Sequence, residues 1–241
     1  MIELPTKKVL ASRANPKRLV IYSKPKAGKT SALALLDNCL LLDFEKGSDY
    51  VDAIKLKIDS LQTLKEVGAE IVKAGKPYKY IAVDTVTALE ELCLGYAKAL
   101  YMDTPMGKSF AGDNVLKLPN GAGYLYLREA FFKILDYIET LVPDDGSIIL
   151  LGHLKDKNID IAGKEVAAVD LDLTGKIKAL VCAKADAIGL LSRKGNQVIL
   201  NFKTSDEITC GARPDHLKNQ EIILTEFTDG NLVASWDKIF V

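Results

Sequence analysis

The chain has 241 residues, of which 48% are hydrophobic, and this is enough to bury one substantial core. The chain has 32 basic residues (Lys and Arg) and 32 acidic ones (Asp and Glu), so it lacks the overall basic excess that indicates a nucleic-acid partner. A local cluster of basic residues can still bind nucleic acid in a neutral chain. The apolar runs are far shorter than the roughly 20 residues of a membrane-spanning helix. The four cysteines have no metal-binding spacing. We therefore expect a cytoplasmic α/β protein of one domain, residues 1–241, with reduced thiols.

Short apolar runs of strand length alternate with longer stretches of helical spacing. The sequence predicts strands at 18–22, 40–44, 80–84, 147–152, 187–191, 197–203 and 221–224. It predicts helices at 29–36, 58–74, 88–100, 124–141 and 176–185, and long polar loops at 101–123 and 155–172. Continuous apolar strands separated by helices indicate a mostly parallel sheet covered on both faces, with the last strands antiparallel. Ligands of such sheets bind at the carboxyl ends of the strands, where the motifs below fall.

The segment SKPKAGKT, residues 23–30, lies between the first predicted strand and the first predicted helix. Gly28, Lys29 and Thr30 match the end of the phosphate-binding loop G-x-x-x-x-G-K-[ST]. In such a loop backbone N–H groups wrap the phosphates, the lysine neutralises the β and γ groups, and the hydroxyl ligates Mg²⁺. The predicted ATP and Mg²⁺ site is therefore Ser23, Lys24, Pro25, Lys26, Ala27, Gly28, Lys29 and Thr30. The alternative is a lysine-rich surface turn.

Two positions in this loop differ from common patterns. Ser23 replaces the first glycine, and a side chain is costly if the backbone there requires a positive φ. Lys24 lies where one subclass of phosphate-binding loops carries a second lysine that reaches across a dimer. That subclass has glycines at the next two positions, where this chain has Pro25 and Lys26.

Carboxylates follow two other predicted strands. Asp84 ends the strand 80–84, the expected place for an acid that holds Mg²⁺ through water together with Thr30. Its alternative role is to cap the next turn. Glu45, in LLLDFEKG, can orient and deprotonate the water that attacks the γ-phosphate. Asp43 competes for that role, because strand alternation points both side chains to the same face.

His153 ends the predicted strand 147–152, next to the strand of the phosphate-binding loop. A neutral imidazole at this position can sense the γ-phosphate and pass its state to the following loop. A single histidine at a strand end is equally compatible with a purely structural role.

With these residues in place, the chain resembles the RecA-like ATPases from about residue 18 to 203. It is most similar to short phage-encoded RecA-core proteins of single-strand annealing and recombination. The resemblance rests on SKPKAGKT, on LLLDFEKG with Glu45 at the catalytic-glutamate position, on YIAVDTVTAL with Asp84, and on SIILLGHLKDK with His153 at the position of a polar sensor. The segment DLTGKIKALVCAKADAIGLLSRKGNQVILNFK resembles the one that follows the second DNA-binding loop. The resemblance implies a three-layer α/β fold with a RecA-like core and ATP hydrolysis stimulated by DNA.

The resemblance also implies partners. It places single-stranded DNA against the predicted loop 155–172, where Lys155, Lys157 and Lys164 can meet phosphates, although acidic residues oppose them and a solvated loop is an equal alternative. The loop 101–123 is the other candidate, because it mixes aromatic side chains with lysines: Tyr101, Lys108, Phe110 and Lys117.

RecA-like sites are completed by a neighbouring subunit, so a homo-oligomeric ring or filament is expected. Lys203 resembles the catalytic lysine supplied in trans, and Arg213 is its rival; a surface charge is the alternative for each. The competing functions are a nucleotide-gated binding module that does not hydrolyse ATP and a helicase-like or loader-like motor.

Overall fold

The computed structural model describes residues 4, 6–161 and 163–241. Its strands are β1 (Arg18–Ser23), β2 (Cys39–Asp43), β3 (Lys55–Lys57), β4 (Tyr80–Asp84), β5 (Ser147–Ile161), β6 (Lys164–Leu171), β7 (Ala187–Lys194), β8 (Gln197–Asn201), β9 (Gly211–Ala212), β10 (Glu221–Thr228) and β11 (Asn231–Ala234). Its α-helices are α1 (Lys29–Leu33), α2 (Leu61–Lys73), α3 (Val86–Met102), α4 (Ala122–Thr140) and α5 (Gly175–Lys184). No helix in the described ranges has the length and apolarity that a bilayer crossing requires.

The strands form a sheet in the order β11-β10-β8-β7-β1-β5-β4-β2-β3. The six strands from β7 to β3 in this order run parallel, whereas β8, β10 and β11 each pair antiparallel with their neighbours. The prediction of a mostly parallel central sheet with antiparallel C-terminal strands is confirmed.

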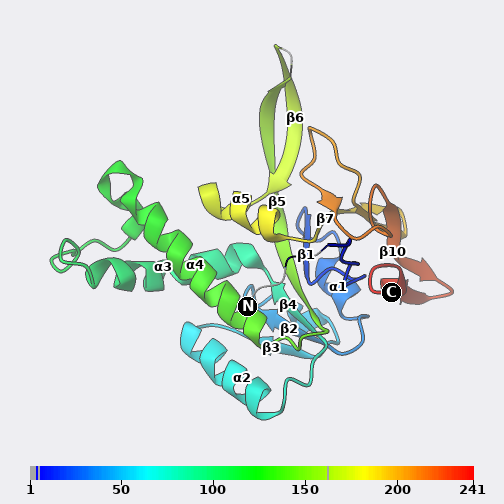
Figure 1. Cartoon of the computed structure of the whole chain (residues 1–241), viewed down its shortest axis with the longest axis horizontal. Helices are drawn as coiled ribbons and strands as arrows, with labels where there is room; N and C mark the ends of the chain where they lie inside the picture. The colour runs from blue at the N-terminus through cyan, green and yellow to red at the C-terminus, as the bar shows by residue number, and fades with distance from the viewer. Residues whose placement is uncertain (1–3, 5, 162) are drawn as a thin grey trace.

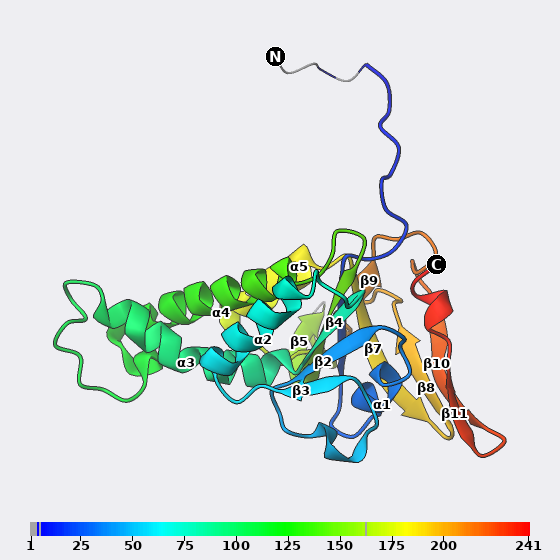
Figure 2. The ribbon, with the colours of Figure 1, turned by 90° about the horizontal axis from the view of Figure 1, so that it is seen from below.

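Helices cover both faces of this sheet and make three layers (Figures 1 and 2). Alternate residues of β1 point to opposite faces: Val20 and Tyr22 to one, Leu19 and Ile21 to the other. The first face packs against α2, α3, α4 and α5. The second packs against α1 and the C-terminal segment, where the Trp236 indole Nε1 donates a hydrogen bond to a carbonyl of α1 at 2.8 Å. The central strands β1, β2 and β4 are therefore buried on both sides, which explains their continuous apolar runs.

Side-chain caps set the first residues of two helices. Ser60 accepts a hydrogen bond from the Thr63 amide at 3.0 Å, so α2 begins at Leu61, three residues later than predicted. Thr85 caps α3 in the same way, so α3 begins at Val86. The short edge strand β3 and the last strand, β11, were not predicted.

The prediction of a long loop at 155–172 is wrong. β5 continues past the sheet to Ile161 and pairs antiparallel with β6, so these residues form a hairpin that projects from the body of the protein (Figure 1). Cross-strand contacts join the two arms, such as Lys157 to Asp170 at 2.8 Å. Beyond its buried base, the side chains of the hairpin are exposed or half-buried, so its sequence has no continuous apolar run of the kind that marks the central strands.

The segment predicted as a loop at 101–123 connects the far ends of α3 and α4, which lie side by side (Figure 2). It contains short 3₁₀ turns at Val115–Lys117 and Pro119–Gly121. A Cβ atom on Gly107 would lie 1.9 Å from the carbonyl oxygen of Tyr101, so the chain can fold back on α3 only with a glycine there.

Candidate nucleotide site

The sheet order brings the predicted motifs to one edge. β1, β5, β4 and β2 are consecutive neighbours, and their carboxyl ends lie at the same edge of the sheet. Ser23 of β1 is in register with His153 of β5, and Asp84 of β4 is in register with Asp43 of β2.

The loop after β1 has the bends that a phosphate-binding loop requires. Lys26 and Gly28 have positive φ angles of 62° and 106°. A Cβ atom at Gly28 would also meet the Val198 side chain of β8 at 3.3 Å, so glycine suits this position for two reasons. Lys24, Pro25 and Lys26 are exposed at the rim of the loop.

Ser23, which replaces the usual first glycine, lies in the extended backbone of β1. The expected cost of a side chain at a positive φ therefore does not arise. Instead the Ser23 hydroxyl donates to the Lys24 carbonyl at 2.8 Å and accepts from Nζ of Lys29 at 3.1 Å. The substitution thus supplies a polar contact that holds the lysine of the loop.

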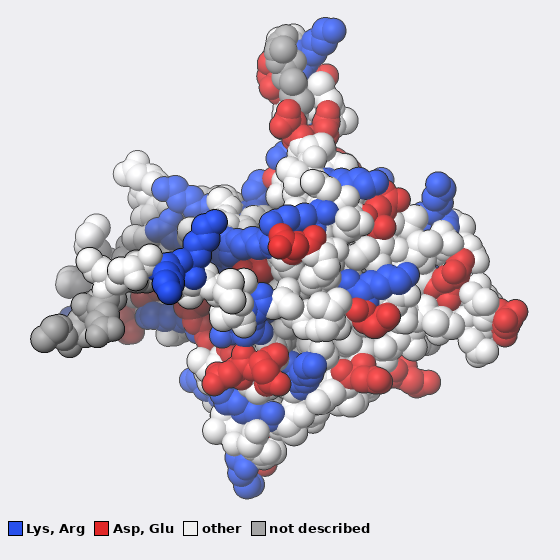
Figure 3. Space-filling model, turned by 45° about the vertical axis from the view of Figure 1, so that its right-hand side comes forward, with Lys and Arg blue, Asp and Glu red and all other residues white. Residues whose placement is uncertain are grey.

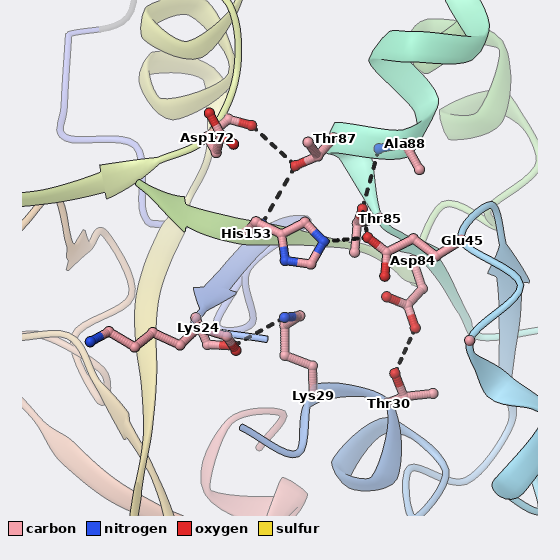
Figure 4. A network of polar contacts seen from close by, with 12 residues as sticks. Lys24, Lys29, Thr30, Glu45, Asp84, Thr85, Thr87, Ala88, His153 and Asp172 are labelled. Carbon is pink, nitrogen blue, oxygen red and sulfur yellow. Dashed lines mark hydrogen bonds and ion pairs between the residues drawn. The ribbon is translucent and has the colours of Figure 1, made fainter. Parts of the chain in front are cut away.

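Lys29 opens α1 and is buried, with 7% of its surface exposed. Burial lowers its pKa, while the nearby carboxylates of Asp84 and Glu45 act in the opposite direction. A buried ammonium at the mouth of this loop is placed to compensate phosphate charge. The Lys24 side chain extends away from Lys29, and Figure 4 shows both.

Thr30 and Asp84 form the second contact of the site. The Thr30 hydroxyl donates to Oδ2 of Asp84 at 2.7 Å. Burial raises the pKa of Asp84 to about 6, with the hydrogen bond from Thr30 acting against the rise. The cap of α3 is Thr85, so the alternative role of Asp84 as a cap is not observed.

This pair fits Mg²⁺. A hydroxyl and one carboxylate are oxygen ligands, and Mg²⁺ in nucleotide sites keeps several waters and uses few protein ligands. The described part of the chain has no group of three or more His, Cys, Asp or Glu side chains that could enclose a metal by itself. A metal at this edge would therefore share its ligands with the nucleotide.

The structure separates the two competing carboxylates. Asp43 is fully buried, and its Oδ2 accepts hydrogen bonds from the Ser48 amide at 3.1 Å and hydroxyl at 2.5 Å, so it is used in fixing a turn. Glu45 is open to solvent and accepts from the Thr85 hydroxyl at 2.7 Å. Its Oε1 also contacts Nε2 of His153 (Figure 4). The geometry favours Glu45 over Asp43 as the group that faces the phosphates.

His153 belongs to the sheet part of β5, and its ring lies beside Glu45 and above Lys29 in the close view (Figure 4). Its second ring nitrogen, Nδ1, is buried and has no hydrogen-bond partner among the described residues. A buried polar atom without a partner is an exception in folded proteins and marks this ring for a functional test.

The chain matches the family model described as "AAA domain" over residues 15–213. The chain belongs to this AAA domain family. No curated protein matches the chain. The AAA domain assignment agrees with the fold and the loop geometry above, and it makes the protein a P-loop NTPase that binds nucleotide.

Sequence reasoning missed two threonines of this AAA domain. Thr85 both caps α3 and holds Glu45, and Thr87 contacts the backbone of β5. The pattern that could have revealed Thr85 is a threonine just before a helix, a common N-cap. Nothing local marks Thr87, because its partners are distant in sequence.

Lys203 and Arg213 do not join the site within one chain. Lys203 pairs with Glu221 at 3.3 Å beside the antiparallel strands. Arg213 pairs with Asp186 at 3.0 Å, at the start of β7 and thus at the edge opposite the phosphate-binding loop. Their role in trans stays a prediction.

Proposed function

We propose that this AAA domain protein hydrolyses ATP with Mg²⁺ and acts on single-stranded DNA in recombination, annealing or repair. The observation that carries the hydrolytic part is Glu45, fixed by Thr85 and His153 beside Lys29. The loop amides and Lys29 would hold the β- and γ-phosphates, and Thr30 and Asp84 would hold Mg²⁺. Glu45 orients the attacking water and takes its proton.

A groove next to the hairpin supports the DNA-binding part. It lies between the first turns of α4 and α5 and has a volume of about 440 Å³. Tyr124 and Leu125 are 49% and 51% exposed there, beside Arg128 and Lys176. An exposed aromatic ring next to two cations suits a stacked base and its phosphates. In the space-filling view basic side chains gather beside the base of the hairpin, whereas the hairpin itself carries both signs (Figure 3).

The groove is a better candidate for DNA contact than either of the two surfaces expected from the sequence. Lys155 pairs with Asp172 at 3.5 Å and Lys157 with Asp170 at 2.8 Å, so these hairpin lysines already have acidic partners. In the 101–123 segment, Tyr101 packs edge-on against Phe110, with 5.3 Å between the ring centres. Those aromatic rings are therefore engaged with each other.

The test is ATP hydrolysis with and without a single-stranded oligonucleotide, beside titrations of labelled oligonucleotide at several salt concentrations. Replacing Arg128 or Lys176 by alanine is expected to reduce the salt slope by roughly 0.7 per lost phosphate contact. Tyr124→Ala is expected to weaken binding by about 1–3 kcal/mol. Lys133→Ala is the matched control, because Lys133 lies on α4 but pairs with Glu129 outside the groove. No binding by the wild type at low salt, with or without a slowly hydrolysed ATP analogue, would leave only a nucleotide switch.

The proposal includes a homo-oligomer, in which Lys203 or Arg213 of one subunit reaches the nucleotide of the next. A sizing measurement with ATP and DNA tests this. If assembly occurs and neither Lys203→Ala nor Arg213→Ala lowers turnover, the contribution in trans comes from elsewhere.

A further inference from the structure

The first turns of α3 touch both the nucleotide site and the start of α5. Thr85 at the cap holds Glu45. Two residues further along, the Thr87 hydroxyl donates to the Asp172 carbonyl at 3.0 Å and lies 3.5 Å from the backbone amide of His153 (Figure 4). One helix therefore contacts the catalytic carboxylate, the strand of His153 and the segment that leads into α5.

Glu90 makes the next contact along α3. It is a buried carboxylate with 8% of its surface exposed, and the nucleotide site does not use it. Both of its oxygens accept from the Thr174 amide, at 3.0 and 3.1 Å. Burial raises the pKa of Glu90. Burying an acidic side chain lowers the stability of the folded state, so Glu90 is expected to have a role other than packing.

The segment 172–174 is short and joins two surfaces. At one side the Asp172 amide donates to the His153 carbonyl at 2.9 Å, and the ring of His153 contacts Glu45. At the other side Thr174 is the N-cap residue of α5 and lines the groove with Lys176. A shift of His153 or Glu45 on binding a γ-phosphate would thus reach the groove through three residues.

We propose that Thr87 and Glu90 are positioning residues that couple the nucleotide site to the first turn of α5. Thr87 ties the segment to β5 near His153, and Glu90 fixes its far end to α3. The coupling is a property of the protein with nucleotide alone; only the identity of the ligand in the groove rests on the proposed function. Because coupling between two sites is reciprocal, a ligand in the groove changes ATP affinity by the same factor as ATP changes the affinity of that ligand.

The test measures amide hydrogen exchange of residues 172–177 with ADP and with a slowly hydrolysed ATP analogue. The wild type is expected to show a difference between the two nucleotides. Thr87→Val and Glu90→Met, which remove the hydroxyl and the acceptors, are expected to reduce the underlying coupling by about 2- to 30-fold while nucleotide affinity remains. A merely structural contact would raise exchange equally in both nucleotide states.

Two further variants serve as matched comparisons. Thr87→Ser keeps the hydroxyl and is expected to keep the difference in exchange between the two nucleotide states. Glu91→Gln, on the exposed side of the same helix, is expected to keep it as well. Absence of any difference in the wild type, or its full persistence in both Thr87→Val and Glu90→Met, would overturn the coupling.

Oligonucleotide titrations of the same variants separate this proposal from the proposed function. If the exchange results hold and no oligonucleotide binds, the coupling stands and the DNA assignment is wrong. If oligonucleotide binds and stimulates hydrolysis equally in the wild type, Thr87→Val and Glu90→Met, the coupling is wrong and the DNA assignment stands.

Discussion

Asp84→Asn is expected to change stability and ligand binding in opposite directions. Burial raises the pKa of Asp84 from 3.8 to about 6. One pKa unit corresponds to about 1.4 kcal/mol, so at pH 7 the ionised carboxylate costs the nucleotide-free native state about 3 kcal/mol. Asparagine is neutral and can still accept the hydrogen bond from Thr30. The variant without nucleotide should therefore be more stable by up to this amount, or about 6–12 °C in melting temperature for a chain of this size.

The gain depends on pH in a defined direction. The folded pKa of this acid is higher than the unfolded one, so native Asp84 takes up a proton as the pH falls through about 6, while the unfolded carboxylate stays charged. The difference in unfolding free energy between variant and wild type is thus largest at pH 7, and it vanishes below about pH 4. Because the proposed Mg²⁺ site uses this carboxylate, Asp84→Asn should also weaken Mg²⁺-dependent nucleotide binding by about 10- to 100-fold.

The assay is denaturant unfolding without nucleotide at several pH values, beside nucleotide titrations with and without Mg²⁺. Asp43→Asn is the matched control, because Asp43 is also buried and in register with Asp84. Its oxygens accept three hydrogen bonds from the turn after β2, so its replacement is expected to destabilise the protein. An Asp84→Asn variant that is no more stable than the wild type at pH 7 would refute the reasoning.

The remaining predictions concern the phosphate-binding loop and Glu45. Lys29→Ala removes the charge that compensates the phosphates, so ATP affinity measured by titration should fall sharply in a folded protein; an unchanged affinity contradicts the assignment. Glu45→Gln should bind ATP normally but turn it over about 10²-fold more slowly in a phosphate-release assay. Normal turnover by this variant, with loss of turnover in an Asp43→Asn variant shown to be folded, would show that the wrong acid was chosen. Gly28→Ala requires a side chain at φ 106° and 3.3 Å from Val198, so both thermal stability and ATP affinity should decrease.

The sequence by itself determined that the motifs follow apolar strands, and it indicated which chemical groups the nucleotide site contains. A phosphate-binding loop is a local feature: the apolar strand, the small bend at Gly28 and the helix that starts at Lys29 are consecutive. Asp84 could be placed for the same reason, because it directly follows a continuous apolar run. Parallel strands buried on both faces leave a strong signal in the sequence, so the fold class followed as well.

Only the tertiary structure decided which carboxylate faces the site. Asp43 and Glu45 are two residues apart and equivalent by strand alternation, but Asp43 is satisfied by the turn at Ser48, whereas Glu45 is held by Thr85 across the sheet edge. The hairpin of β5 and β6 was also beyond local reasoning, because its pairing satisfies backbone groups in a segment with little apolar surface to bury. The contact of Glu90 with Thr174 joins residues 84 positions apart, and no spacing or propensity within either segment specifies it. Local motifs fix the chemistry that a strand end can carry, while the packing of distant segments decides which polar groups meet.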